Sequence, residues 1–224
     1  MEGGRANPSL LRLVGLAGAL EVSLAVLLAG LPKLESRRRL RHAALLGLRG
    51  AGKSSVGPRV AEALGVRFVE LDQRVEAETG LQLSEMFVMH GEDYYRRAER
   101  VALERLLAEP QPTVIAVGGG LVVEPESFAL LRNSAVTAWL RAEPQDHWQR
   151  VRSQGDTRPM ADNDKAFTDL RRILSVREPL YRLADATVET SGRSVLEVTE
   201  DVVAKLREGP FCEKSGEPTA RPDA

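Results

Sequence analysis

One glycine-rich stretch of the chain has the residue types and the spacing needed to bind phosphate. Gly47 is followed after four residues by Gly52-Lys53-Ser54, the G-x-x-x-x-G-K-[ST] pattern of a phosphate-binding loop. Glycines let backbone N–H groups turn inward around anionic oxygens, and the N-terminus of the following helix adds partial positive charge. Lys53 can reach the β- and γ-phosphates, and the Ser54 hydroxyl can bind Mg²⁺. The stretch therefore predicts a nucleotide site; the alternative is a strand-to-helix turn with a chance lysine.

Two carboxylates follow a later apolar run. Glu70-Leu71-Asp72 comes at the end of a strand predicted at 66–71, and alternate residues of a strand point to the same side. In a doubly wound α/β sheet, ligands bind beyond the carboxyl ends of the strands. The pair therefore predicts a site that combines a magnesium ligand with a general base. The interpretation in which Asp72 only caps the next helix is equally open.

Four further stretches carry residues suited to an anionic ligand. Arg96 and Glu99 lie three residues apart on a predicted helix, either within a site or as a surface ion pair. The glycines 118–120 follow a predicted strand, where the backbone can approach a ligand closely, although a plain turn is the alternative. Arg158 lies in a polar stretch suited to a lid over phosphate, and Arg177 precedes a helix-interrupting proline.

The elements that must position these residues alternate between strands and helices, which is typical of a parallel α/β sheet. Strands are predicted at 43–46, 66–71, 113–117, 135–140 and 186–189. Helices are predicted at 53–64, 72–79, 83–90, 92–107, 125–131, 144–153, 166–183 and 195–205. The predicted fold class is α/β, a P-loop NTPase fold in which helices flank a five-stranded parallel sheet and one segment forms a lid.

Composition limits the class of protein. The 224 residues provide for one well-packed core. The net charge is −1 and 4% of residues are aromatic, so neither a basic field nor a base-stacking surface recruits nucleic acid. The single Cys212 excludes an intrachain disulfide and fits a reducing, cytoplasmic setting. His42, His90 and His147 share no metal-ligand spacing, so we interpret them as packing or surface residues.

The two ends of the chain differ from the predicted sheet. Residues 10–31 are strongly apolar, but Arg12 and Glu21 within them would be costly inside a bilayer, so we predict short helices and no membrane span. The basic stretch after them is interpreted as a solvated linker, with a nucleic-acid contact as the less favoured alternative. The predicted parts are a helical appendage at 1–31, a linker at 32–42, a domain at 43–208 and a disordered tail at 209–224.

These motifs, in this order and spacing, resemble those of the shikimate kinase family, a branch of the P-loop small-molecule kinases. The resemblance covers residues 43–206 and rests on five ordered motifs, not on the loop alone. It implies ATP and Mg²⁺ as cofactors, with Ser54 as the protein's metal ligand. The residues implied to hold the ATP phosphates are Gly50, Ala51, Gly52, Lys53, Ser54, Ser55 and Arg158.

The resemblance also implies a reaction and a substrate side of the site. ATP would phosphorylate the 3-hydroxyl of shikimate, with Asp72, Lys53 and Arg158 as catalytic residues and Asp72 as the base. Asp72 and the Gly119 backbone would contact the substrate, while Arg96 and Arg177 would pair with its carboxylate. The protein is expected to be a cytoplasmic monomer without a nucleic-acid or membrane partner.

Two features depart from this family. Glu70 stands where its members usually carry an aspartate, and residues 1–31 resemble the last two helices of a repressor-type helix-turn-helix domain without its recognition helix. Together with 158–163, they resemble bacterial regulators of aerobic benzoate degradation, whose kinase-like domain senses benzoyl-CoA. In that interpretation the N-terminus is truncated. We predict the kinase, because every matched residue is present; a non-enzymatic nucleotide-binding module is the third hypothesis.

Overall fold

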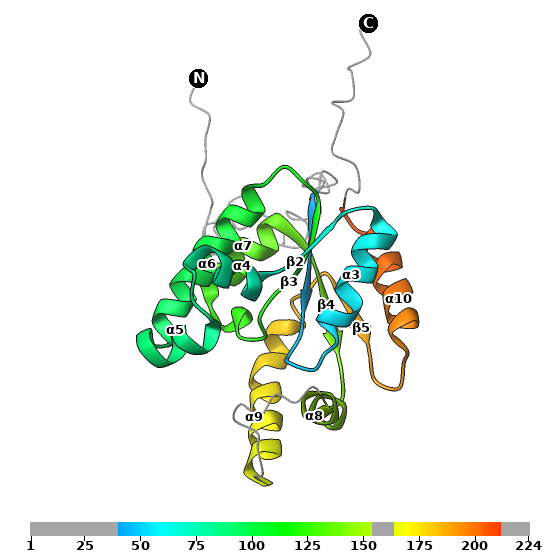
Figure 1. Ribbon diagram of the computed structural model, residues 1–224. Coiled ribbons are helices and arrows are strands. Elements are labelled where there is room, and N and C mark those ends of the chain that lie inside the picture. The colour runs from blue at the N-terminus through cyan, green and yellow to red at the C-terminus, as the bar shows by residue number, and fades with distance from the viewer. Residues whose placement is uncertain (1–39, 154–163, 212–224) are drawn as a thin grey trace, which may run out of the picture. The chain divides into compact units, whose positions relative to one another are not determined.

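The computed structural model describes residues 40–153 and 164–211 of the 224-residue chain (Figure 1). The chain separates into two compact units, Met1–Arg38 and Arg39–Ala224, and every described residue belongs to the second. The predicted appendage, most of the predicted linker, the lid residue Arg158 and the tail after Phe211 lie outside the described residues.

A five-stranded parallel sheet forms the centre of the second unit. Its strands are β1 (His42–Leu46), β2 (Arg67–Glu70), β3 (Thr113–Ala116), β4 (Ala135–Arg141) and β5 (Ala186–Glu189). They lie in the order β2-β3-β1-β4-β5, and every ladder is parallel. The α/β class predicted from the sequence is confirmed. The chain passes from β1 to β2 and β3 on one side of β1, and then crosses to β4 and β5 on the other side. In such a fold the ligand crevice lies at this change of direction, beyond the carboxyl ends of β1 and β3.

Helices cover both faces of this sheet. In Figure 1, α3 (Lys53–Leu64) and α10 (Val195–Glu208) lie on one face, and α4 (Leu71–Thr79), α6 (Glu92–Ala108) and α7 (Pro125–Ser134) on the other. The remaining elements are α5 (Leu83–His90), the 3₁₀ helix η1 (Leu121–Val123), α8 (Pro144–Ser153) and α9 (Asp164–Tyr181). Successive residues of β1 face opposite cores, Ala43 and Leu45 on one side and Ala44 and Leu46 on the other. This explains why the strand is apolar throughout this stretch.

The junction of β2 and α4 differs from the prediction. We predicted a strand through residue 71, but β2 ends at Glu70 and α4 begins at Leu71. Asp72 therefore lies in the first turn of a helix, and strand alternation does not explain its direction. The helix-cap position is Glu70, whose side chain makes no capping hydrogen bond, so the capping interpretation of Asp72 is wrong as well. η1 is a further element that was not predicted, because three residues are too few to show a hydrophobic period.

The folded body extends past residues 43–208 at both ends. The Leu40 amide donates to the Pro210 carbonyl at 2.9 Å, and Leu40 forms a parallel bridge with Phe211. The Phe211 side chain is buried in the core beneath α3 and α10. One apolar residue from the predicted linker and one from the predicted tail thus pack together, a pairing that requires tertiary contact.

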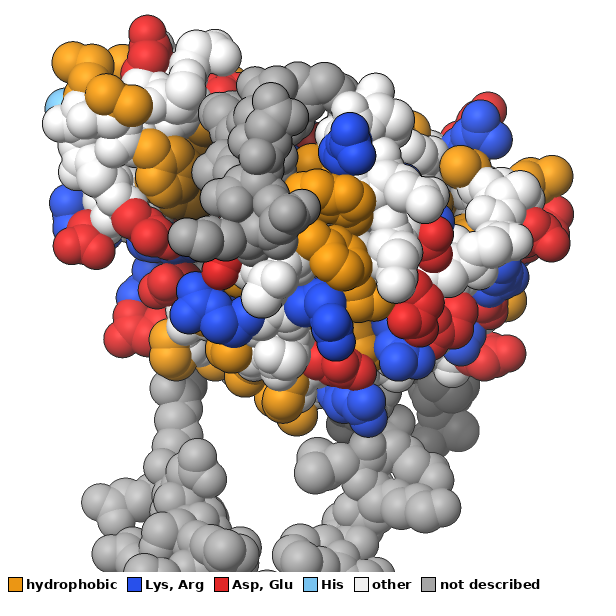
Figure 2. All heavy atoms as spheres, turned by 90° about the horizontal axis from the view of Figure 1, so that it is seen from below, with side chains coloured by type: hydrophobic (Ala, Val, Ile, Leu, Met, Phe, Trp, Pro, Cys, Tyr) orange, Lys and Arg blue, Asp and Glu red, His pale blue; other side chains and the backbone are white. Residues whose placement is uncertain are grey.

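The surface of the described residues is mixed in charge. On the face shown in Figure 2, basic and acidic side chains are interspersed, with no extended patch of one sign among the atoms that are described. None of the helices within 40–153 and 164–211 is long and apolar enough to span a bilayer.

Candidate active site

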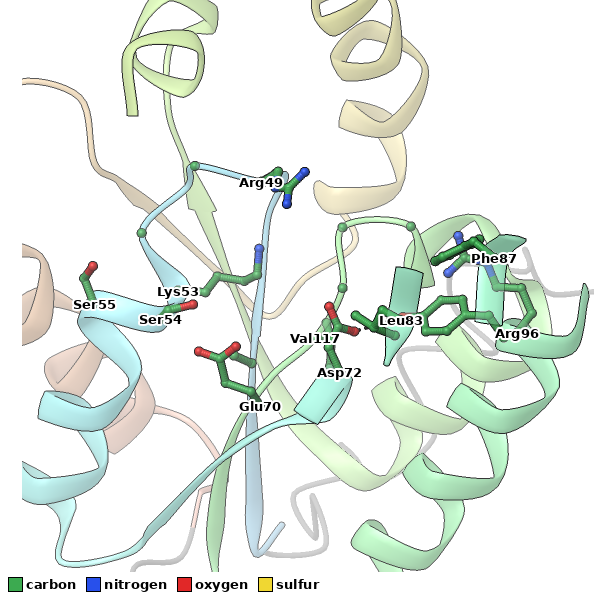
Figure 3. A pocket seen from close by; sticks show the side chains of 17 residues that line it. Arg49, Lys53, Ser54, Ser55, Glu70, Asp72, Leu83, Phe87, Arg96 and Val117 are labelled. Atoms are coloured by element: carbon green, nitrogen blue, oxygen red, sulfur yellow. Dashed lines mark hydrogen bonds between the residues drawn. The ribbon is translucent and has the colours of Figure 1, made fainter. Parts of the chain in front are cut away.

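A cavity of about 550 Å³ opens beyond the carboxyl ends of the central strands (Figure 3). It is lined by the loop after β1, by the junction of β2 and α4, by the glycines that follow β3, and by side chains from α5 and α6. The predicted site residues that line it are Gly50, Gly52, Lys53, Ser54, Ser55, Asp72, Arg96 and Gly119. In Figure 3, Asp72 lies between the Lys53 side and the Arg96 side of this cavity.

Two predicted site residues, Ala51 and Arg177, do not line the cavity, and a third is not among the described residues. Ala51 belongs to the loop but is fully buried and packs in the core of α3, so only its backbone is available to a ligand. The Arg177 guanidinium does not line the cavity in this conformation; it donates to the Gly119 carbonyl at 3.0 Å. Arg158 lies outside the described residues, so its role stays a prediction.

The loop after β1 depends on glycine at three positions. Gly47, Gly50 and Gly52 have φ of 142°, 77° and 98°, which L-residues rarely adopt. A Cβ at Gly47 would lie 2.8 Å from the Leu140 carbonyl oxygen, and one at Gly50 would lie 2.8 Å from the His147 carbonyl oxygen. The glycines therefore serve both the turn and the close contact of the loop with its neighbours.

The Lys53 amino group is folded back against its own loop. It donates to the Gly47 carbonyl at 2.7 Å and to the Leu48 carbonyl at 3.2 Å. Burial lowers the pKa of Lys53 to about 8, although Asp72 and Glu70 oppose that shift. An anionic phosphate beside this amino group would raise the pKa of Lys53 again, so binding of a negatively charged ligand favours the charged form of the lysine.

Helix α8 supports the loop through two side chains that contact backbone carbonyls of the loop. His147 is buried, and its Nδ1 lies 2.8 Å from the Arg49 carbonyl oxygen, 98 residues away in sequence; because a carbonyl only accepts, Nδ1 must carry the hydrogen. Burial lowers the pKa of His147 to about 4, so the ring is neutral near pH 7. Arg150 donates to the Gly50 carbonyl at 3.3 Å and to the Thr190 carbonyl at 2.8 Å. No local pattern in the sequence signals these contacts.

The carboxylates of Glu70 and Asp72 both point into the cavity (Figure 3). They come from two elements, the last residue of β2 and the first turn of α4. Asp72 accepts a hydrogen bond at 2.9 Å from the hydroxyl of Tyr95, which the sequence analysis did not single out. Tyr95 precedes Arg96 directly on α6, so its position beside a predicted site residue was the available signal.

Arg96 lies among acidic side chains. Its Nη1 donates to Glu99 at 2.9 Å and its Nη2 donates to Glu92 at 2.8 Å, and its side chain is 15% exposed. Burial disfavours the charge, but the hydrogen bonds of Arg96 to its acidic neighbours outweigh burial and raise its pKa. A Cβ at Gly120 would lie 2.3 Å from Arg96 Nη2, so the last glycine of the run makes room for the guanidinium. The predicted contact between Arg96 and Glu99 exists, but Glu99 is fully buried, so it is not a solvated surface pair.

The fold and the loop define this protein as a P-loop nucleotide-binding protein. The cavity beside the loop has a second half, which is lined by polar side chains of α4 and α6. The sequence model of the shikimate kinase family matches residues 49–207, which is most of the chain. The chain belongs to the shikimate kinase family.

Similar proteins agree with this assignment. The chain is 40% identical to a shikimate kinase of Nitrobacter winogradskyi over 148 residues, 66% of this chain and 68% of the relative. It is 39% identical to one of Caulobacter vibrioides, over 76% of this chain and 84% of the relative. A solved shikimate kinase from Acinetobacter baumannii, in complex with shikimate, has a TM-score of 0.69 and 28% identity, and the match covers 78% of this chain and 97% of that one. None of these three relatives favours the regulator interpretation, and its N-terminal helices lie outside the described residues.

Proposed function

We propose that this chain is a shikimate kinase, which transfers the γ-phosphoryl group of ATP to the 3-hydroxyl of shikimate. The observation that carries the proposal is the single cavity lined both by the phosphate-binding loop and by the carboxylate and arginine of α4 and α6. Phosphoryl transfer requires the donor and the acceptor hydroxyl to be held in line with their charge neutralised, and one shared cavity is the arrangement that allows this.

The loop side would hold the phosphates. The backbone amides of 50–55 and the N-terminus of α3 favour negative charge, and Lys53 would leave the Gly47 carbonyl to neutralise the transferred group. Arg158 would add a second positive charge from the predicted lid.

The opposite side would hold shikimate. Its carboxylate would bind Arg96 by taking the place of Glu92, because the Glu92 side chain is 64% exposed whereas Glu99 is fully buried. Arg177 and the Gly119 backbone would complete this side, since Arg177 already contacts the Gly119 carbonyl. An arginine fork is the natural partner of a carboxylate, and Asp72 is the natural acceptor for a hydroxyl proton.

The residues of the cavity fit a magnesium ion. Mg²⁺ in kinase sites keeps several waters and binds phosphate oxygens with one or two protein oxygens, and the hydroxyl of Ser54 and the carboxylate of Glu70 both line the cavity. The described residues contain no cluster of three acidic, histidine or cysteine ligands, which agrees with such a sparse shell. When bound, the ion would supply charge neutralisation between the phosphates. A monomeric state and a cytoplasmic location stay predictions.

The test is an ADP-release assay with shikimate, with ³¹P NMR of the product. We expect ADP release that depends on shikimate and yields one phosphate ester, and no turnover of an analogue that lacks the 3-hydroxyl. Absence of shikimate-dependent ADP release would overturn the proposal. A thermal-shift measurement with benzoyl-CoA is the parallel arm: stabilisation by that ester together with no turnover would select the ligand-sensing function instead.

A further inference from the structure

A line of hydrogen-bonded oxygens runs from Asp72, at the cavity wall, to Arg96 on the other side of the acceptor half of the cavity. The Tyr95 hydroxyl lies 2.9 Å from Asp72 Oδ1 and 2.9 Å from Glu99 Oε1. The other oxygen of Glu99 accepts from Arg96 at 2.9 Å. A continuous chain therefore runs from the proposed base, through a phenol and a second carboxylate, to the arginine proposed to bind substrate.

The count of hydrogens limits how this chain can be protonated. A phenol has one hydrogen, and an ionised carboxylate has none to donate. With both carboxylates ionised, one of the two 2.9 Å contacts would place two acceptor oxygens together without a hydrogen between them. Both contacts become hydrogen bonds when one carboxyl group supplies a second hydrogen.

The surroundings place that second hydrogen on Glu99. Its side chain is 0% exposed, and burial raises its pKa more than Arg96 lowers it. Asp72, by contrast, lines the open cavity, and the amino group of Lys53 lies near its carboxyl group. The other charged groups near the chain are Glu70 beside Lys53, and Glu92 and Glu124 beside Arg96.

We propose that Tyr95 is a positioning residue whose hydroxyl donates its hydrogen to Asp72, while a protonated Glu99 donates to Tyr95. This inference rests on the proposed function, in which Asp72 is the base. In this arrangement the bond from Tyr95 directs the Asp72 side chain into the cavity. A neutral Glu99 can still accept from Arg96 but leaves the arginine's positive charge for a ligand carboxylate, opposed only by the peripheral Glu92 and Glu124.

Packing holds the hydrogen-bonded groups Asp72, Tyr95 and Glu99 in place. A Cβ at Gly118 would lie 3.2 Å from Glu99 Oε1, 3.3 Å from Asp72 Oδ1 and 3.4 Å from the Tyr95 hydroxyl, so the first glycine of the run covers all three groups. The ring of Tyr95 is held on its other side by Phe87 of α5, at a centroid distance of 4.9 Å. The phenol therefore has little freedom to choose other partners.

The first test is the pH profile of kcat/KM for shikimate in Tyr95→Phe. Losing a donor to Asp72 destabilises its carboxylate, so we expect the acidic limb to move up by about one pH unit. Because the same bond directs Asp72 into the cavity, its loss should also lower kcat at neutral pH about tenfold. The KM for ATP should not change. Tyr94→Phe is the matched control: Tyr94 lies on the same helix but its ring contacts that of His90, so the variant should leave the limb in place. An acidic limb that is unmoved, or moved down, in Tyr95→Phe would overturn the proposal.

The second test replaces Glu99. Gln has nearly the shape of a protonated glutamate, with an N–H that can donate to Tyr95 and a carbonyl oxygen that can accept from Arg96. Glu99→Gln should therefore keep the acidic limb in its wild-type position, whereas Glu99→Ala should not. If Glu99 is ionised in the wild type, Glu99→Gln removes a negative charge near Asp72 and the limb moves down, which contradicts the proposal. This variant decides the question even if Tyr95→Phe fails to fold.

A measurement without turnover separates this inference from the proposed function. If the wild type does not phosphorylate shikimate, the proposed function is wrong. The hydrogen-bond chain is then tested separately, by infrared difference spectra of the wild type against Glu99→Gln at neutral pH. A protonated-carboxyl band lost in the variant supports the chain. No such band in the wild type refutes it.

Discussion

The two halves of the cavity are built in different ways. The phosphate half is one continuous segment, in which the loop after β1 and the first turn of α3 provide the backbone amides, the lysine and the hydroxyl. The acceptor half is assembled from α4, α6 and the glycines after β3, with Arg177 of α9 behind them. The residues of the first half are neighbours in the chain, although α8 supports their loop, whereas only tertiary packing brings the residues of the second half together.

This difference predicts how each half fails. A change in the loop should disturb ATP alone, because the loop contributes the phosphate side of the cavity and none of the groups proposed to bind shikimate. A change in the acceptor half should disturb shikimate and the proton transfer, and its effect should spread along the hydrogen-bonded groups that hold that half together.

The largest effect is expected from Asp72→Asn. The amide cannot accept the hydroxyl proton, so kcat should fall by about 10²- to 10⁴-fold while ATP binding survives. ADP release and ATP affinity are measured on the same preparation, with Asp93→Asn, an exposed residue of α6, as the control. Normal turnover in Asp72→Asn would show that the base is elsewhere.

The next effect concerns the loop alone. Gly50→Ala places a Cβ 2.8 Å from the His147 carbonyl oxygen at a residue with φ of 77°, so the KM for ATP should rise by about a hundredfold while the KM for shikimate changes little. Gly65→Ala is the matched control: its φ is 64°, but a Cβ there meets nothing within 4 Å. It should lose about 1 kcal/mol of stability from backbone strain and keep its ATP affinity. An equal rise in the KM for ATP in both variants would show that the contact of Gly50 with α8 is not the cause.

Arg96→Ala and Arg177→Ala should have the converse effect. Each removes a charged hydrogen bond to the substrate carboxylate, so the KM for shikimate should rise about ten- to a hundredfold and the KM for ATP should stay constant. Arg97→Ala, exposed on the same helix as Arg96, is the control. Unchanged shikimate KM in both variants would exclude these arginines from the substrate side.

The smallest effect is a pH dependence of stability from His147. Its pKa is about 4 in the folded protein against the ordinary 6.5, so the unfolded chain binds a proton that the folded chain does not. The contribution of this residue is complete above pH 6.5 and is lost as the pH falls toward 4, by about 2 kcal/mol at pH 5. Urea unfolding of His147→Asn should show a weaker loss between pH 7.5 and pH 5, roughly by that amount. The exposed His90→Asn should behave like the wild type, and a wild-type response in His147→Asn would assign the dependence to another group.

The sequence allowed much of this fold to be predicted. The strands and most helices lie where hydrophobic periodicity placed them. Each strand or helix buries one apolar face, and the spacing of its apolar residues can be read from a short stretch of sequence. The end of β2 was misplaced by one residue, since Glu70 and Asp72 carry no signal that separates a strand end from a helix start. The pairing of Leu40 with Phe211 was missed, because each lies in a polar stretch and gains its partner only in the folded chain.

The sequence by itself determined the phosphate-binding loop, because its glycines, lysine and serine act over a few successive residues. Only the tertiary structure decided that Tyr95 stands between Asp72 and Glu99, and that His147 supports Arg49 from 98 residues away. The physical reason is that backbone conformation depends on neighbours in the chain, whereas hydrogen-bond partners and burial depend on neighbours in space.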